Sequence, residues 1–478
     1  MEDILVLEIT GSKKWLILVI TSISTFMATL DSSIVNIALP VISKDLKVSI
    51  SQIQWVVTSY LLTISMLLLV WGKLSDLYGK KKIFSSGFII FALGSGMCGL
   101  SHTLEFLVIS RIVQAIGASA MMSLSQGIVT GTFPPEERGK ALGFVGAMVA
   151  LGNMTGPSLG GILLHFFNWQ AIFFINVPIG IIGLIASAIV IPEIFEVQDV
   201  KYFDLKGTLL FSFGVLVLFL GLLFVQQGTI PTIYLIPAII IAAAAFILFV
   251  FVEKKSINPL IDPALFKIHE FSYGLVAAYL SFIALISVLF FMPFYLENLL
   301  KLSALHASII ISVYPLTTAI VAPISGWLSD KLTYRPLTIT GMAAATVSLL
   351  LLSTLHRNSP IWEILLLLCL LGFGIATFQS PNNSSVMGSV QRDQLGIAGG
   401  INALFRNLGL VSGAAFSVLI YSFSTKSSIN SLSGGKFNPS SFIKGFSYIM
   451  LFDAVCTFIA MLISVRRTVK TAKEEIQK

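Results

Sequence analysis

Charged residues are scarce in this chain. Only 11% of its 478 residues are charged, whereas soluble domains carry about 25%. The hydrophobic fraction is 56% and the mean hydropathy is +0.92. This balance excludes a soluble globular protein.

Cysteine, metal-ligand spacings and nucleotide loops are also lacking. The three cysteines lie inside apolar segments without paired spacing, and the five histidines show no ligand pattern, so neither a disulfide framework nor a metal site is expected. No Gly-Lys-Ser or Gly-Lys-Thr phosphate loop occurs. We therefore expect no cofactor, and an ion gradient rather than ATP as the energy source.

Long apolar runs are what the chain has in abundance. A membrane-spanning helix needs about 20 apolar residues, and such runs recur almost without interruption. They start near residues 15, 52, 83, 104, 141, 172, 205, 234, 271, 304, 337, 362, 396 and 445. The sequence predicts an all-α membrane protein with about fourteen transmembrane helices.

The basic residues predict the orientation in the membrane. The net charge of +7 does not indicate a nucleic-acid partner, because the 30 Lys and Arg residues sit mostly in short loops between apolar segments. Most of these basic residues lie on the side of the N-terminus. The positive-inside rule then places both termini in the cytoplasm.

An internal repeat predicts the domain organisation. The second span is followed by GKLSD at 72–76 and the tenth by GWLSD at 326–330. This spacing favours two six-helix bundles with two inserted helices between them. We assign the first bundle to 1–195, the insertion to 196–268, the second bundle to 269–467 and a cytoplasmic tail to 468–478.

The first copy of the repeat carries a family resemblance. From Gly72 the chain reads GKLSDLYGKKK, which resembles the loop signature between the second and third helices of the major facilitator superfamily. The resemblance assigns Gly72, Asp76, Gly79 and Lys80 to a cytoplasmic gate. Leu77 stands where that family usually has a basic residue.

The fifth span resembles the motif that marks antiporters in this superfamily. From Gly152 it reads GNMTGPSLGG. Gly152, Gly156 and Gly160 share one helix face and allow a close helix contact, while Pro157 bends the segment and Gly161 completes the motif. Ordinary packing of small residues is the alternative interpretation.

The first span resembles that of the fourteen-helix drug:proton antiporter branch. Residues 30–40 read LDSSIVNIALP, and residues 111–118 read RIVQAIGA, similar to the family's Arg-x-x-Gln-Gly motif. A carboxylate inside a span is costly, so Asp31 is a functional candidate. We expect Asp31 and Arg111 to face each other and to couple protons to transport. The alternative is that Asp31 reaches the outer interface or caps a helix break.

Three further polar residues fall within spans. Gln114 belongs to the Arg111 motif, and Arg406 and Asp453 lie in the last two spans. We list all three as possible cavity residues. Arg406 and Asp453 could equally stabilise helix contacts as buried polar groups.

The resemblance, which covers nearly the whole chain, implies the major facilitator fold and a function. We expect a monomeric, proton-coupled exporter of small amphipathic or lipophilic compounds in a bacterial cytoplasmic membrane, acting in multidrug or antibiotic efflux. A dedicated exporter of one metabolite, lipid or siderophore is the alternative on the same fold. A membrane enzyme or sensor is a distant third, since no catalytic cluster or soluble output domain is visible in the sequence.

Overall fold

The computed structural model describes residues 11–192, 203–226, 235–256, 259–425 and 437–467. The predicted tail at 468–478 and the predicted boundary between 195 and 196 lie outside these residues. The described part of the chain is almost entirely helical. Its principal helices are α1 (Ser12–Asp45), α3 (Trp55–Tyr78), α4 (Lys80–Gly99), α5 (Leu104–Thr132), α6 (Arg138–Phe166), α7 (Ala171–Phe174), α8 (Asn176–Val190), α9 (Leu205–Gln226), α10 (Leu235–Glu253), α11 (His269–Phe294), α12 (Ala304–Leu332), α13 (Tyr334–Leu352), α14 (Ile361–Gly388), α15 (Leu395–Thr425) and α16 (Pro439–Arg466).

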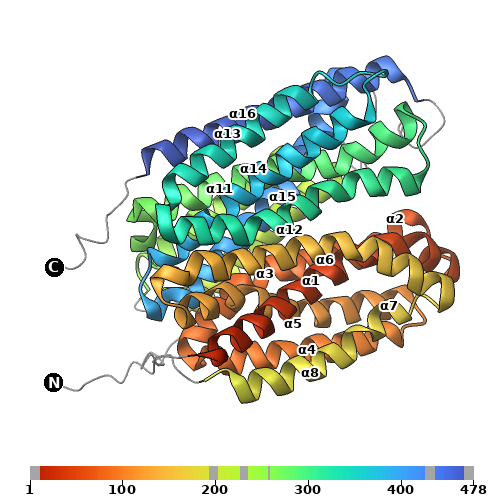
Figure 1. Ribbon diagram of the computed structural model, residues 1–478. Coiled ribbons are helices and arrows are strands. Elements are labelled where there is room, and N and C mark those ends of the chain that lie inside the picture. Colours follow the sequence, from red (N-terminus) through yellow and green to blue (C-terminus); the bar gives the residue numbers. More distant parts are fainter. Residues whose placement is uncertain (1–10, 193–202, 227–234, 257–258, 426–436, 468–478) are drawn as a thin grey trace, which may run out of the picture.

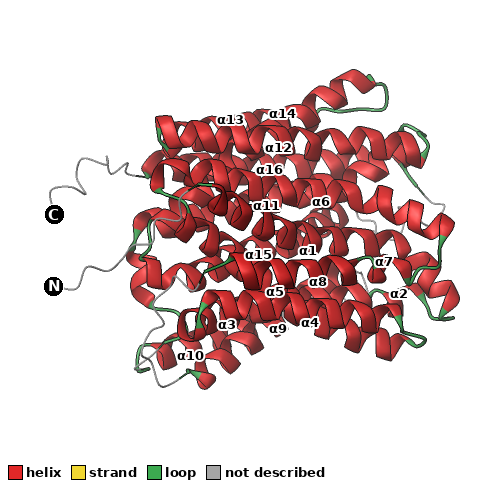
Figure 2. Cartoon of the chain, turned by 60° about the horizontal axis from the view of Figure 1, so that its bottom comes forward, coloured by secondary structure: helices red, strands yellow, loops and turns green. Residues whose placement is uncertain are grey.

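The predicted fold class is confirmed. Within the described residues, 14 helical segments are long and apolar enough to cross a membrane. They run side by side along one direction, and no strand interrupts them in the described part of the chain (Figure 2). The beginning of α1 and the end of α16 lie at the same end of the molecule (Figure 1), which we call the terminal face.

The helices group as the repeat predicts. In the first bundle α5 packs on α1, α3 and α4, α1 also packs on α6, and α4 packs on α8. In the second bundle α13 packs on α14 and α16, and α11 packs on α15. Helices α9 and α10 pack on each other at the edge, with α9 touching both α3 and α15 (Figure 2). The domain boundaries themselves stay a prediction.

The two bundles meet along two pairs of surfaces. α6 packs on α12, and α15 packs on both α3 and α5. The bundles lie close together near the terminal face and diverge toward the other end of the molecule (Figure 1). We call that other end the open end.

Both copies of the repeat form the same turn. Gly79, three residues after Asp76, has φ +99° and ψ +132° between α3 and α4. Thr333, three residues after Asp330, has φ +87° and ψ +155° between α12 and α13. Glycine adopts such a conformation readily, but threonine is strained there. The repeat therefore keeps the same backbone geometry in both copies, and in the second copy this strains the backbone at Thr333.

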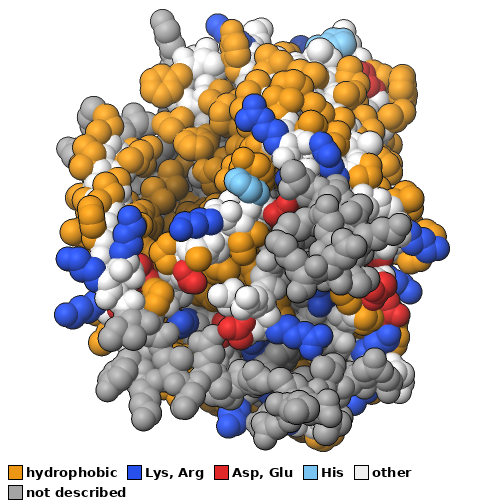
Figure 3. Space-filling model, turned by 90° about the vertical axis from the view of Figure 1, so that its left-hand side faces the viewer, with side chains coloured by type: hydrophobic (Ala, Val, Ile, Leu, Met, Phe, Trp, Pro, Cys, Tyr) orange, Lys and Arg blue, Asp and Glu red, His pale blue; other side chains and the backbone are white. Residues whose placement is uncertain are grey.

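Lysine and arginine side chains are spread over the terminal face (Figure 3). This agrees with the charge asymmetry read from the sequence, because the loops of that face carry most of the basic residues. Which side of the membrane this face occupies stays a prediction.

Candidate coupling site and gate

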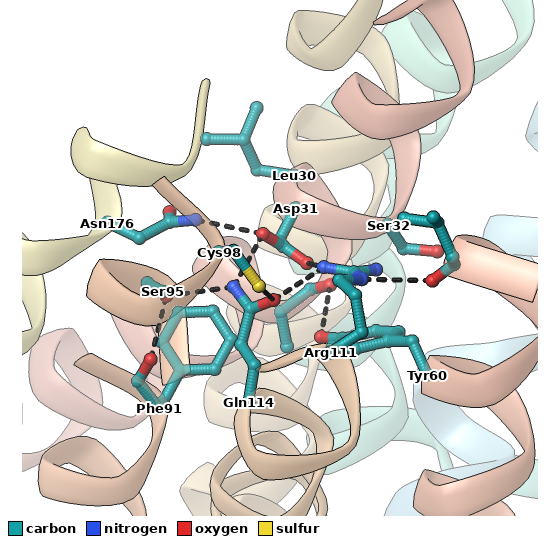
Figure 4. Close-up of polar contacts among 12 residues, drawn as sticks. Leu30, Asp31, Ser32, Tyr60, Phe91, Ser95, Cys98, Arg111, Gln114 and Asn176 are labelled. Carbon is teal, nitrogen blue, oxygen red and sulfur yellow. Dashed lines mark hydrogen bonds and ion pairs between the residues drawn. The ribbon is translucent and has the colours of Figure 1, made fainter. Parts of the chain in front are cut away.

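Asp31 lies midway along α1 and is completely buried. Its carboxylate accepts hydrogen bonds from three side chains. Arg111 Nη1 donates to Oδ2 at 2.5 Å, while Gln114 Nε2 and Asn176 Nδ2 donate to Oδ1 at 2.8 and 2.9 Å. Figure 4 shows these donors converging on Asp31 from α5 and α8. The predicted pairing with Arg111 is present, and Asp31 does not reach an interface.

Arg111 is as buried as its partner. Its Nε donates to the carbonyl oxygen of Val56 at 3.1 Å, and its guanidinium carbon lies 3.9 Å from the centre of the Tyr60 ring. Gln114 accepts from Arg111 at 2.6 Å and donates to Ser95 Oγ at 2.8 Å (Figure 4). The network thus joins α1, α3, α4, α5 and α8 of the first bundle.

This arrangement makes the charge state of Asp31 structurally important. A buried ion pair whose partner is removed leaves an uncompensated charge, which costs about 3–5 kcal/mol. Arg111 Nη2 has no hydrogen-bond partner among the described residues. A proton arriving at Asp31 would therefore release a guanidinium that already lacks one acceptor, and the surrounding helices would have to rearrange.

The glycines of the antiporter-like motif in α6 pack closely against α1 beside Asp31. A Cβ atom added to Gly152 would collide with Thr29, and one added to Gly156 would collide with Ser33. Ser33 Oγ donates to the Gly152 carbonyl oxygen at 3.1 Å. The glycine face therefore fixes the two turns of α1 that flank Asp31. Gly160 continues this face against Ile34, whereas Pro157 is exposed and Gly161 has open space around its Cα.

We expect Gly156→Val to destabilise the protein by about 1–3 kcal/mol or more, because an overpacked helix contact must separate. Gly161→Val is the matched control, since nothing lies within 4 Å of a Cβ atom added at Gly161. Thermal unfolding of both purified variants in detergent measures the difference. Equal midpoints for the two variants would contradict the close α1–α6 contact.

The gate motif places Asp76 across the bundle interface. Asp76 accepts hydrogen bonds from the backbone N–H groups of Gly396 and Ile397, at 3.2 and 3.0 Å, in the first turn of α15. Lys80 pairs with the same carboxylate at 2.8 Å. The positive end of a helix dipole stabilises a carboxylate. Gly72 permits the contact, because a Cβ there would collide with the backbone of Gly396.

Asp330 makes the reciprocal contact. It accepts hydrogen bonds from the backbone N–H groups of Gly139 and Lys140 at 2.7 and 2.9 Å, in the first turn of α6. Each bundle thus contributes one carboxylate to the N-terminus of a helix in the other bundle. Both contacts lie at the terminal face, so that end of the molecule is held closed.

The three predicted cavity residues differ in how deeply they are buried. Gln114 and Asp453 are completely buried in this structure, and their role as cavity residues stays a prediction. Asp453 accepts from Ser287 Oγ at 3.1 Å inside the second bundle. Arg406 is half-buried and forms no ion pair with Asp453 or with any other described residue. Of the three, Arg406 alone is not completely buried.

Two residues of these sites were not assigned a role from the sequence. Asn176 completes the donors to Asp31, and Asp330 completes the gate. Asp330 could have been found from the repeat, since it occupies the position of Asp76. Asn176 begins a helix after a short turn, and nothing in its spacing indicates a contact with α1.

Comparison with known proteins agrees with this architecture. The family model described as Major Facilitator Superfamily matches residues 21–201, 207–414 and 275–478. The riboflavin transporter RibZ of Clostridioides difficile (strain 630) is 40% identical over 404 residues, covering 84% of this chain and 87% of that protein. The tetracenomycin C resistance and export protein of Streptomyces glaucescens is 30% identical over 408 residues, covering 84% and 75%.

Solved structures are similar in fold. The human organic anion transporter MFSD10 superposes with a TM-score of 0.68 over 94% of this chain and 99% of that one, at 14% identity. So distant a relationship shows the fold alone. Together with the family model, which matches nearly the whole chain, these findings establish that the protein is a multi-pass membrane transporter of the major facilitator superfamily.

Proposed function

We propose that the protein is a proton-coupled exporter of small amphipathic or lipophilic compounds in a bacterial cytoplasmic membrane. The observation that carries this proposal is the completely buried Asp31–Arg111 pair beside the α6 glycine face. An ionisable pair inside a membrane span is expensive and marks an ion path by default. Proton binding at Asp31 would change the packing of α1 against α6, which also contacts the second bundle through α12.

The gate supports an alternating-access cycle. With both termini in the cytoplasm, the contacts of Asp76 and Asp330 close the cytoplasmic side, and the diverging end faces outward. Opening the other side requires both carboxylates to leave their helix N-termini. The proton gradient supplies the energy in this proposal, without a bound cofactor, and one chain contains both bundles and the path between them.

A dedicated transporter of one metabolite is the second candidate. The specific observation in its favour is the 40% identity to a protein named as a riboflavin transporter. The exporters of antibiotics among the relatives are less similar, at 30% for the tetracenomycin C protein. The two candidates share the fold and the coupling site, and they differ in how many compounds one protein carries.

Proteoliposomes with an imposed pH gradient test the proposal. We expect at least one compound from a panel of riboflavin, ethidium and anionic aromatic dyes to move against the direction of proton flow, and reversal of the gradient to reverse the movement. Movement of several compounds would favour multidrug efflux, and riboflavin alone would favour the dedicated transporter. Compound and protons moving in the same direction would contradict antiport.

A further inference from the structure

Arg406 lies in the middle of a transmembrane helix and has no ion-pair partner among the described residues. It lies 11 residues after Leu395, the first residue of α15, which is about 17 Å along the helix axis. No carboxylate of the described residues pairs with it, and its guanidinium carbon lies 5.9 Å from the centre of the Phe282 ring in α11. Charged side chains at this depth face a water-filled path or a partner.

The neighbouring turn of α15 shows which way Arg406 faces. Asn402 donates to Gln126 of the first bundle at 2.6 Å and to Asn383 of α14 at 3.1 Å. Residues four apart share a helix face. Arg406 therefore lies close to the α15 face that contacts the first bundle, one turn from the Asn402–Gln126 contact toward the open end.

A second unpaired donor lies at the same level. Gln379 is one turn before Asn383 in α14, and its buried Nε2 has no hydrogen-bond partner in the described structure. α14 and α15 run in opposite directions, and Asn402 of α15 donates a hydrogen bond to Asn383 of α14. Gln379 and Arg406 therefore both lie one turn from that bond toward the open end. An unmet buried donor costs about 1–3 kcal/mol, so an acceptor is expected there.

We infer that Arg406 and Gln379 form a substrate subsite that binds the acidic group of a planar aromatic anion. The guanidinium supplies charge and paired donors for a carboxylate, the Gln379 amide supplies a further donor, and Phe282 supplies a ring surface. This inference rests on the proposed transport of a small organic compound between the bundles, and it specifies the charge of that compound.

The subsite selects against cations. Asp31 is already neutralised by Arg111, and Asp453 is sealed inside the second bundle. At the level of Arg406, the charge that lacks a counter-charge among the described residues is therefore positive. A cationic dye such as ethidium would be repelled at this subsite, whereas an aromatic carboxylate would neutralise it.

A charge series on one ring system tests the inference. Anthracene carboxylate, anthracene methanol and aminomethyl anthracene are titrated into the purified full-length protein in detergent, with binding measured by ring fluorescence. We expect the carboxylate to bind about 10- to 100-fold more tightly than the other two. Arg406→Gln should remove this preference, Arg406→Lys should retain part of it, and Gln379→Leu should weaken the carboxylate alone.

Arg357→Gln is the matched control, because this exposed loop arginine lies away from the subsite and should leave all three affinities unchanged. Equal affinities for the three ligands, tighter binding of the amine, or no binding of any ligand by the folded wild type would each overturn the inference. So would an Arg406→Gln protein that unfolds at the wild-type temperature and keeps the carboxylate preference. No gradient is applied, so failure of proton coupling does not affect the result.

Discussion

Replacing Asp31 with asparagine is expected to lower gradient-driven transport at least about 100-fold, because an amide cannot take up or release a proton. Asparagine keeps the shape of the side chain and can still accept from Gln114 or Asn176. Substrate exchange across the membrane without a pH gradient should persist, since it needs the conformational change but not the coupled proton. Initial rates in proteoliposomes, with and without the gradient, measure both quantities.

Loss of folding is the competing explanation for an inactive Asp31→Asn protein. The single change leaves Arg111 as an unpaired buried cation, at a cost of about 3–5 kcal/mol. Asp31→Asn combined with Arg111→Gln removes both charges and should fold better than the single variant, while remaining uncoupled. Glu105→Gln, which removes an exposed carboxylate at the start of α5, is the control for loss of a charge as such. Gradient-driven transport by the folded double variant would show that the pair is only structural.

The sequence predicted the Asp31–Arg111 pair for a physical reason. A charge inside an apolar run must find an opposite charge or water, and the chain offers few buried charges from which to choose. The same scarcity predicted the helices, since apolar runs of sufficient length have one low-energy form in a bilayer. Where the cost of placing polar groups in the bilayer dominates, the sequence therefore predicts both the helices and the buried ion pair.

The neutral residues of the network around Asp31 and Arg111 could not be predicted in this way. Asn176, Ser95 and Tyr60 are neutral, and many similar residues occur in the spans without comparable contacts. Which of them meet depends on the rotation and depth of each helix. Those are set by packing, such as the fit of the α6 glycines against Thr29 and Ser33, rather than by composition. The burial of Gln114 and Asp453 within their bundles depends on the same packing.

The gate is the other place where a single atom change should have a large effect. Asp330→Asn removes the charge that meets the two N–H groups at the start of α6. Hydrogen bonds to a charged group contribute about 1.5–3 kcal/mol each. Weakening them should shift the equilibrium between the closed and open forms of the terminal face by about 10- to 100-fold. We expect transport to fall by about tenfold or more, because the closed form is then reached less often.

Spin labels at Lys82 and Arg392, both exposed and on different bundles, report this equilibrium as a distance. Asp330→Asn should add a population with a longer distance, and Asp76→Asn should do the same, since each carboxylate holds a helix of the opposite bundle. Both substitutions should lengthen the distance, but by different amounts. Asp76 also pairs with Lys80, and Asp76→Asn would leave that lysine without its counter-charge. Glu136→Gln, an exposed acidic residue at the same face, should leave the distances unchanged. An unaltered distance distribution in the Asp330 and Asp76 variants would mean that close glycine contacts, of Gly139 with Gly326 and of Gly72 with Gly396, keep the terminal face closed. The hydrogen bonds of the two carboxylates would then be a consequence of that closure rather than its cause.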